Sequence, residues 1–260
     1  MEFNNNQMNN QMNNQMNSQM DNQVRNLFPS LWANDEELGQ ATSTCLTKVF
    51  IRMFAALLVT AVTAFATANS QAMITLIYGN PATLIVLIIV ELGLVLGISA
   101  GINKMSPTVA NVLFFAYAAV NGLTLSVVFL AFDIGLVYRA FAVSALMFAG
   151  IAIYGSVTHR DLTSIGSICI MGLFGLLIAS VVNIFFRSDM IDAIICYAGV
   201  LVFVGLTAYD TQHIKKMLHD ANFDSHEIAI KRISVTGALR LYLDFINLFL
   251  KILRILGRKR

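Results

Sequence analysis

Seven runs of about twenty mostly apolar residues constrain this chain more than any other feature. A helix of that length crosses the roughly 30 Å hydrocarbon layer of a membrane. Of the 260 residues, 57% are hydrophobic and 12% are charged, against roughly 25% charged in soluble domains. The sequence therefore predicts an all-α integral membrane protein with seven transmembrane helices. The predicted spans are approximately Val49–Ala68, Ala82–Ile102, Val109–Phe132, Leu136–Val157, Ile165–Phe186, Met190–Gln212 and Ile233–Leu256.

The composition divides the chain into three regions. Residues 1–26 repeat Asn, Gln and Met with almost no charge, which is typical of a disordered tail and not of a secretory signal. Residues 27–47 form a polar lead-in, and residues 48–260 hold the seven-helix transmembrane domain. Most connections are short, so consecutive helices are expected to be antiparallel neighbours. The exception is a long hydrophilic loop, Ile214–Arg232, between the last two helices.

The distribution of Lys and Arg predicts the orientation in the membrane. Nine of them lie on the side of the N-terminus, against Arg139 and Arg187 in the loops of the other side. The N-terminus is therefore predicted to be cytoplasmic. The basic C-terminal tail opposes this, because an odd number of crossings places it outside. A last segment that dips into the membrane and returns would place both ends inside, and both arrangements keep the loop after Asp210 in the cytoplasm.

Few ionisable residues lie inside the predicted spans. Glu91 is mid-helix with no charge within ten residues on either side, so its partner must come from another helix. Asp210 closes the sixth span, and Asp244 lies eleven residues into the seventh. Arg240, Asp244 and Asn247 share one helical face, so this polar stripe is expected to point inward. Intramembrane acids usually face the bundle interior and mark ion or proton paths.

Two opposed carboxylates have a specific chemistry. If Asp210 and Asp244 face each other, both cannot ionise without a large free-energy cost, so they share a proton and titrate as a pair. Protonated, the pair holds the last two helices together. Ionised, it repels and leaves oxygen ligands for a cation. This is a pH latch, for which a static polar clamp is the alternative interpretation. Arg240, one turn before Asp244, is the candidate local counter-charge.

Calcium suits these residues better than a transition metal, because it prefers several oxygen ligands. The candidate ligands are Asp210, Asp244 and Glu91, since all four histidines are expected in loops, without inward-facing cysteines. No tightly bound cofactor is expected. Glu91 has a plainer interpretation as a hydrogen-bonded acid inside the bundle. On another face of its helix, Gly93, Gly97 and Gly101 form a ridge of the kind that packs closely against a second transmembrane helix.

Two segments resemble the signature of a known family. They are GLTAYDTQHIKK, from Gly205 to Lys216, and ALRLYLDFINLFLKILRILG, from Ala238 to Gly257. Both are similar to the Bax inhibitor-like, transmembrane Bax-inhibitor-motif family, and the chain resembles a bacterial-type member from about Lys48 to its C-terminus. The resemblance implies a seven-helix fold with the last helix central. It also implies a pH-sensitive calcium leak gated by two aspartates.

In this resemblance the two aspartates fall on Asp210 and Asp244, and the family's second-helix acid falls on Glu91. One position departs from the family. Relatives with a characterised leak carry an arginine about eleven residues after that acid, which bonds the aspartates in the closed form. Ile102 holds that place here. Lys104 and Arg240 are the two candidate replacements for the missing cation.

The leading hypothesis is a passive, proton-regulated calcium leak in a bacterial inner membrane, with the bilayer, calcium and protons as partners. The alternative from the resemblance is a non-conducting regulator that binds a membrane-anchored quality-control protease. Enzymatic activity is not expected, because intramembrane aspartyl proteases require G-x-G-D at the second aspartate, where this chain has Leu241–Asp244. A net charge of +2 gives no basis for nucleic-acid binding.

Overall fold

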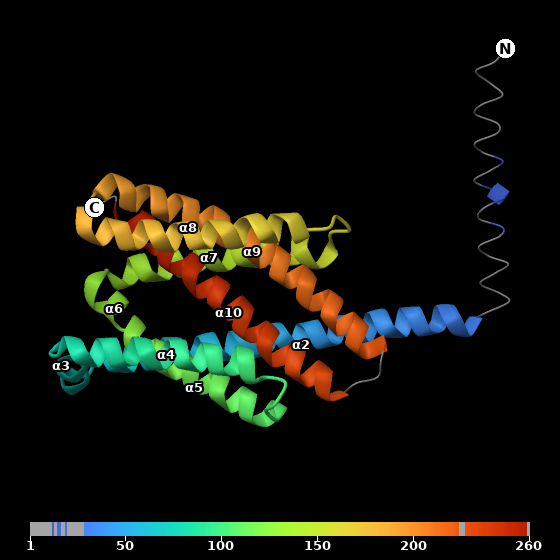
Figure 1. The fold of residues 1–260 in the computed structure, drawn as a ribbon, viewed down its shortest axis with the longest axis horizontal. Helices are drawn as coiled ribbons and strands as arrows, with labels where there is room; N and C mark the ends of the chain where they lie inside the picture. The colour runs from blue at the N-terminus through green and yellow to red at the C-terminus, as the bar shows by residue number, and fades with distance from the viewer. Residues whose placement is uncertain (1–11, 13–14, 17–18, 20–28, 224–226, 259–260) are drawn as a thin grey trace, which may run out of the picture.

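A computed structural model describes residues 12, 15–16, 19, 29–223 and 227–258. Within these ranges every regular element is a helix (Figure 1). The helices are α2 (Pro29–Ala68), α3 (Gln71–Tyr78), α4 (Pro81–Gly101), α5 (Pro107–Leu125), α6 (Val127–Ala131), α7 (Ile134–Val157), α8 (Thr163–Phe186), α9 (Asp189–Phe223) and α10 (Glu227–Gly257). In the described part of the chain, seven helical stretches are long and apolar enough to cross a membrane, α5 and α6 together making one of them. The predicted all-α, seven-helix fold is confirmed.

Proline and small polar residues determine where several helices begin. Pro81 and Pro107 occupy the first turns of α4 and α5, where a missing N–H leaves no intrahelical bond unmade. The side chain of Asn80 accepts a hydrogen bond from the backbone N–H of Ala82 at 3.0 Å. Ser106 caps α5 in the same way. These caps satisfy backbone donors that a helix start otherwise leaves unpaired.

The prediction that Ile214–Arg232 forms a hydrophilic loop is wrong. α9 continues to Phe223 and α10 already begins at Glu227, so most of this segment is helical. The segment is amphipathic, with Ile214 and Leu218 fully buried one turn apart, while its described charged residues are exposed except for the half-buried Arg232. A helix with one apolar stripe is stable beyond the membrane when that stripe packs on a neighbour. The charge content of the segment concealed this stripe.

The last helix lies at the centre of the bundle, as predicted. α10 packs against α9, α2, α7 and α5. In its most apolar stretch 67% of the residues are buried, against 6% in the corresponding stretches of α4 and α8, which are therefore peripheral. In Figure 1, α10 (red) runs diagonally between α2, α4 and α5 on one side and α7, α8 and α9 on the other. Residues of α10 therefore contact both halves of the molecule.

The two ends of the transmembrane bundle are on opposite sides. The start of α2 and the end of α10 lie at opposite ends of the bundle in Figure 1, as seven crossings require. α10 is a continuous helix of 31 residues. A last segment that dips in and returns does not fit this geometry. The predicted tail, residues 1–26, lies outside the described residues except at positions 12, 15, 16 and 19.

Glycines allow the closest helix contacts. A Cβ atom at Gly155 of α7 would collide with the backbone carbonyl of Ala208 in α9. A Cβ atom at Gly122 of α5 would lie 2.7 Å from the carbonyl oxygen of Thr60 in α2. The predicted glycine ridge on α4 makes no such close contact at Gly93 or Gly97. A Cβ atom at either residue would meet no described atom within 4 Å. This ridge therefore does not pack against another helix in the described structure.

Candidate ion and proton site

Asp210 and Arg240 form an ion pair between α9 and α10. Nη1 of Arg240 lies 3.4 Å from Oδ1 of Asp210, so the guanidinium donates a weak hydrogen bond to the carboxylate. The Asp210 side chain is 12% exposed and that of Arg240 is 50% exposed. The sequence placed Arg240 beside Asp244, on its own helix. The structure instead directs the guanidinium across to α9, although its charge still acts on Asp244.

Asp244 is buried on the same side of α10. Its residue is 5% exposed, and its Oδ2 atom has no hydrogen-bond partner in the described structure. The charge of Asp210 acts on Asp244 through space, so the two predicted acids lie within range of each other's charge. A buried carboxylate without compensation costs several kcal/mol. A proton shared with Asp210, or a cation held between the two groups, would remove that cost.

A polar pocket lies against the part of α9 that follows the membrane segment. It has a volume of about 690 Å³ and is lined by Tyr209, Gln212, His213 and Lys216 of α9, by His159, Arg160 and Asp161 of the loop after α7, and by Thr163 at the start of α8. The rings of Tyr209 and His213 are stacked with centroids 5.5 Å apart. The charge of His213 acts on Asp210. His213 therefore connects this pocket electrostatically to Asp210, which does not itself line it.

The predicted loop position of the histidines is wrong for two of them. His213 and His219 lie in α9, because this helix extends past the membrane segment. His159 lies in the loop between α7 and α8 as predicted. His226 is outside the described residues. The extension of α9 places His213 one helical turn from Asp210, a proximity that the sequence-based boundary did not predict.

Gln212 is a site residue that sequence reasoning missed. Its Oε1 accepts a hydrogen bond from the backbone N–H of Leu162 at 3.0 Å, and its Nε2 donates to the carbonyl of Arg160 at 2.8 Å. In the same loop, hydrogen bonds from the hydroxyl and N–H of Thr163 hold the pKa of Asp161 below its usual value. Gln212 thus fixes the loop that lines the pocket. A polar residue at the very end of an apolar span was the available signal.

Glu91 belongs to a separate polar cluster. The hydroxyl of Thr124 in α5 donates a hydrogen bond to Oε1 of Glu91, and the side chain of Asn121 also acts on this carboxyl group. Asn121 in turn accepts a hydrogen bond from the hydroxyl of Tyr242 at 3.2 Å. Tyr242 and Asp244 are two residues apart on α10, so they point to nearly opposite sides of the helix. The structure therefore does not bring Glu91 to the aspartate pair.

The remaining predicted residues have simpler environments. Lys104 is exposed in the turn after α4, so of the two candidate cations only Arg240 contacts an aspartate. Asn247 is half-buried and donates to the carbonyl of Leu243 in its own helix at 2.8 Å. No three His, Cys, Asp or Glu side chains converge anywhere in the described ranges. Calcium at the aspartate pair would therefore take its other oxygens from backbone carbonyls or water.

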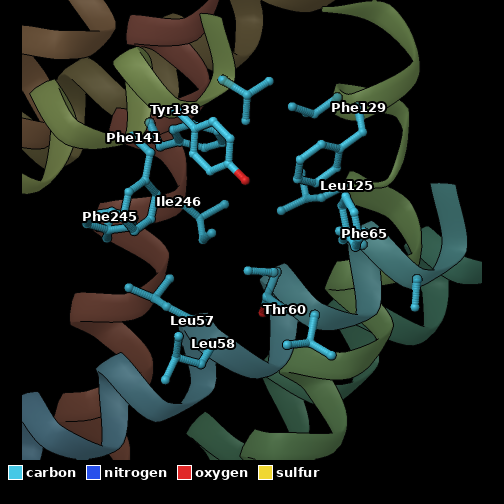
Figure 2. A pocket seen from close by; sticks show the side chains of 17 residues that line it. Leu57, Leu58, Thr60, Phe65, Leu125, Phe129, Tyr138, Phe141, Phe245 and Ile246 are labelled. Carbon is cyan, nitrogen blue, oxygen red and sulfur yellow. The ribbon is translucent and has the colours of Figure 1, made fainter. Parts of the chain in front are cut away.

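A second pocket, between the membrane-spanning helices, has no charged lining. It measures about 490 Å³ and lies among α2, α5, α6, α7 and α10. Figure 2 shows Phe65 and Phe129 on one side of it and Phe141 and Phe245 on the other. No acidic or basic side chain lines it. A dehydrated cation would find no ligand set there, so the aspartate pair is the better candidate for the functional site.

Comparisons with known proteins place the chain among bacterial membrane proteins. Residues 42–260 match the family described as inhibitor of apoptosis-promoting Bax1. An uncharacterized protein of Borreliella burgdorferi is 44% identical over 215 residues, covering 83% of this chain and 92% of the relative. The inner membrane protein YbhL of Escherichia coli K12 is 43% identical over 218 residues, covering 84% of this chain and 92% of the relative. An uncharacterized protein of Deinococcus radiodurans is 36% identical over 213 residues, covering 82% and 89%.

Proposed function

Because the chain belongs to the Bax inhibitor-like family of multi-pass membrane proteins, we propose that it is a passive, proton-regulated calcium leak gated by Asp210 and Asp244. The observation that carries the proposal is the environment of Asp244. This carboxyl is buried, lies within range of the charge of Asp210, and has an oxygen atom without a hydrogen-bond partner in the described part of the chain. The name of the Escherichia coli relative supports a bacterial inner membrane, and the Lys and Arg distribution supports a cytoplasmic N-terminus.

The gating step is a loss of one proton. At acid pH the two carboxyl groups share a proton, and the resulting hydrogen bond holds α9 against α10. Raising the pH removes the proton and leaves two like charges. For unit charges 4 Å apart at an effective dielectric of about 20, Coulomb repulsion is about 4 kcal/mol. This is enough to separate two helices at one contact, and it creates an anionic site that attracts a divalent cation.

Arg240 and the polar pocket complete the path in this proposal. Arg240 balances one negative charge, so the open pair carries a single net charge that binds calcium weakly enough to release it. The polar pocket lined by His213 provides hydrated access from the end where α9 meets the loop after α7. Glu91 provides a second carboxylate for the calcium ion on the other side of α10. Calcium therefore crosses by exchange between oxygen ligands and water, without a fixed binding cage.

Calcium uptake into proteoliposomes tests the proposal. Vesicles containing the full chain and a trapped calcium indicator are compared with protein-free vesicles between about pH 5 and about pH 8, a range that spans the titration of perturbed carboxyl groups. We expect uptake to rise with pH in the protein-containing vesicles alone. Uptake that equals that of empty vesicles at every pH would reject the leak. It would favour the non-conducting regulator, for which co-purification with a membrane-anchored protease is the next measurement.

Replacing Arg240 with glutamine is expected to shift the onset of calcium uptake to higher pH by about 1 unit. The guanidinium favours the ionised form of Asp210, and its removal lets the pair keep its proton longer. The shift is modest because the Arg240 side chain is half exposed. Arg240→Lys keeps the charge and is the matched control. An onset in Arg240→Gln that coincides with the wild type would show that Arg240 does not act on the latch.

A further inference from the structure

The buried hydroxyl of Tyr242 connects α10 to two other helices. Tyr242 is fully buried, and its hydroxyl lies 2.7 Å from Oγ1 of Thr60 in α2. It also donates to Oδ1 of Asn121 in α5 at 3.2 Å. Thr60 lies 2.8 Å from the carbonyl oxygen of Ala118, also in α5. These contacts form one hydrogen-bonded cluster that joins α2, α5 and α10 inside an apolar bundle.

The same cluster reaches Glu91 on α4. Asn121 donates to the hydroxyl of Tyr117 at 3.4 Å, Thr124 donates to the Glu91 carboxyl, and the Asn121 side chain also acts on that carboxyl. A chain of polar contacts therefore runs from Glu91 through Asn121 and Tyr242 to Thr60. We call it the Tyr242 chain. Inside a membrane, each of these polar groups would lose its partner if the helices moved apart, and no water would replace it.

The Tyr242 chain and the aspartate pair hold opposite sides of α10. At 100° per residue, Tyr242 and Asp244 point about 160° apart around the helix. Tyr242 faces α2 and α5, whereas Asp244 acts on Asp210 in α9. A rotation of α10 that withdrew Asp244 from α9 would therefore also pull the Tyr242 hydroxyl away from Thr60 and Asn121. The two polar contacts cannot change independently by rotation of α10.

We propose that Tyr242 is a positioning residue whose hydrogen bonds fix the rotation of α10, hold Asp244 against Asp210, and transmit changes at Glu91 to the aspartate pair. This inference rests on the proposed function and adds the regulation of that same site. It also identifies the moving part. Because α10 is fixed to α2 and α5 by the Tyr242 chain, separation of the carboxylates moves α9 away from α10.

The charged and titratable groups around this part of α10 come from several helices. Those that interact electrostatically with the pair are Arg240 on α10, His213 on α9 and the Cys169 thiol on α8. Glu91 on α4 and Tyr117 on α5 face Tyr242. From α2, Thr60 contacts Tyr242, and from α7, Phe141 and Phe148 contact the neighbouring Phe245. None of these three side chains titrates. Substitutions at Tyr242, Thr60 or Glu91 leave all the groups that act directly on the pair unchanged.

The test measures the protonation of the pair and calcium uptake separately. Infrared titration of the protonated carboxyl band, in purified full-length protein with labelled aspartate, gives the pH midpoint of the pair without any flux. Tyr242→Phe keeps the ring, which packs edge-on against Phe114 at 5.8 Å, and removes only the hydroxyl. We expect this midpoint to fall by about 0.5 to 1 pH unit, because a loosened α10 separates the carboxyl groups.

The partners of Tyr242 provide matched variants. Thr60→Val removes the facing hydroxyl and is expected to give the same shift, whereas Thr60→Ser keeps a hydroxyl and is expected to restore the wild-type midpoint. The double variant Tyr242→Phe with Thr60→Val is expected to shift no further than either single variant. Glu91→Gln is expected to shift the midpoint in the wild type but not in Tyr242→Phe. Thr60→Val also provides the test if Tyr242→Phe does not fold.

The outcomes separate this inference from the proposed function. An unchanged midpoint in folded Tyr242→Phe or Thr60→Val overturns the positioning role, whatever the calcium uptake of the wild type. Shifts as large in Thr60→Ser as in Thr60→Val overturn it as well, since they would reflect packing and not the hydroxyl. A shifted midpoint in a protein that passes no calcium supports the positioning role and rejects the leak.

Discussion

Asp244→Asn is expected to make calcium uptake low and independent of pH, whereas uptake by the wild type rises with pH. Asparagine has nearly the same size but cannot ionise, so the repulsion that opens the pair is absent at every pH. Its amide can also donate a hydrogen bond to Asp210, which keeps α9 and α10 together. Since 1.4 kcal/mol corresponds to tenfold and the repulsion amounts to several kcal/mol, we expect at least about a tenfold loss of uptake at alkaline pH.

Asp192→Asn is the matched control for this experiment. Asp192 lies in the first turn of α9 and its carboxylate pairs with Arg254 of α10 at 3.0 Å, so it is also an acid that links these two helices. It lies at the opposite end of α9 from the aspartate pair. We expect Asp192→Asn to retain the wild-type pH response. Uptake by Asp244→Asn that still rises with pH as in the wild type would show that the pair is not the sensor.

Gly155→Val is expected to cause the largest loss of stability of any single change considered for this fold. The added Cβ atom would overlap the carbonyl of Ala208. The same Cβ atom would lie only 3.0 Å from Cα of Ala208. These obstacles are backbone atoms of α9, so no rotamer change can relieve them. Overpacking of this kind costs about 1–3 kcal/mol, and more when the backbone must move. We expect a clear drop in the thermal unfolding temperature in detergent, with aggregation on size-exclusion chromatography.

Gly150→Val, on the same helix, separates this contact from helix propensity. A Cβ atom at Gly150 would meet no described atom within 4 Å, and the residue is exposed. Both variants exchange glycine for valine inside α7, so the intrinsic change is the same. We expect the unfolding temperature of Gly150→Val to stay near the wild type. Equal losses in the two variants would show that the α7–α9 approach does not limit stability.

The helices were predictable because their signal is local. A run of about twenty apolar residues has one stable structure in lipid, and the ends are marked by residues such as Pro81 and Pro107. The prediction failed at Ile214–Arg232 because charge content hid an apolar stripe that packs on the bundle. It failed again at Gly93 and Gly97, since a ridge of small residues permits a close contact without specifying a partner.

The site was predictable in its acids and less so in their partners. Asp210 and Asp244 stood out because acids are rare inside apolar spans. The pairing of Arg240 with Asp210 depends on how α9 and α10 are rotated relative to each other, which spacing along one helix does not report. The partners of Glu91 are neutral side chains far along the chain, so no complementary charge marked them. They become apparent only when α4 and α5 are packed together.

Structures of the full protein at acid and alkaline pH test the central claim most directly, through the distance between the carboxyl groups of Asp210 and Asp244. The account predicts a hydrogen bond of about 2.5–2.7 Å between them at acid pH. At alkaline pH it predicts separated carboxylates, with α9 displaced and Tyr242 still bonded to Thr60. The same carboxyl separation and the same position of α9 at both pH values would contradict it.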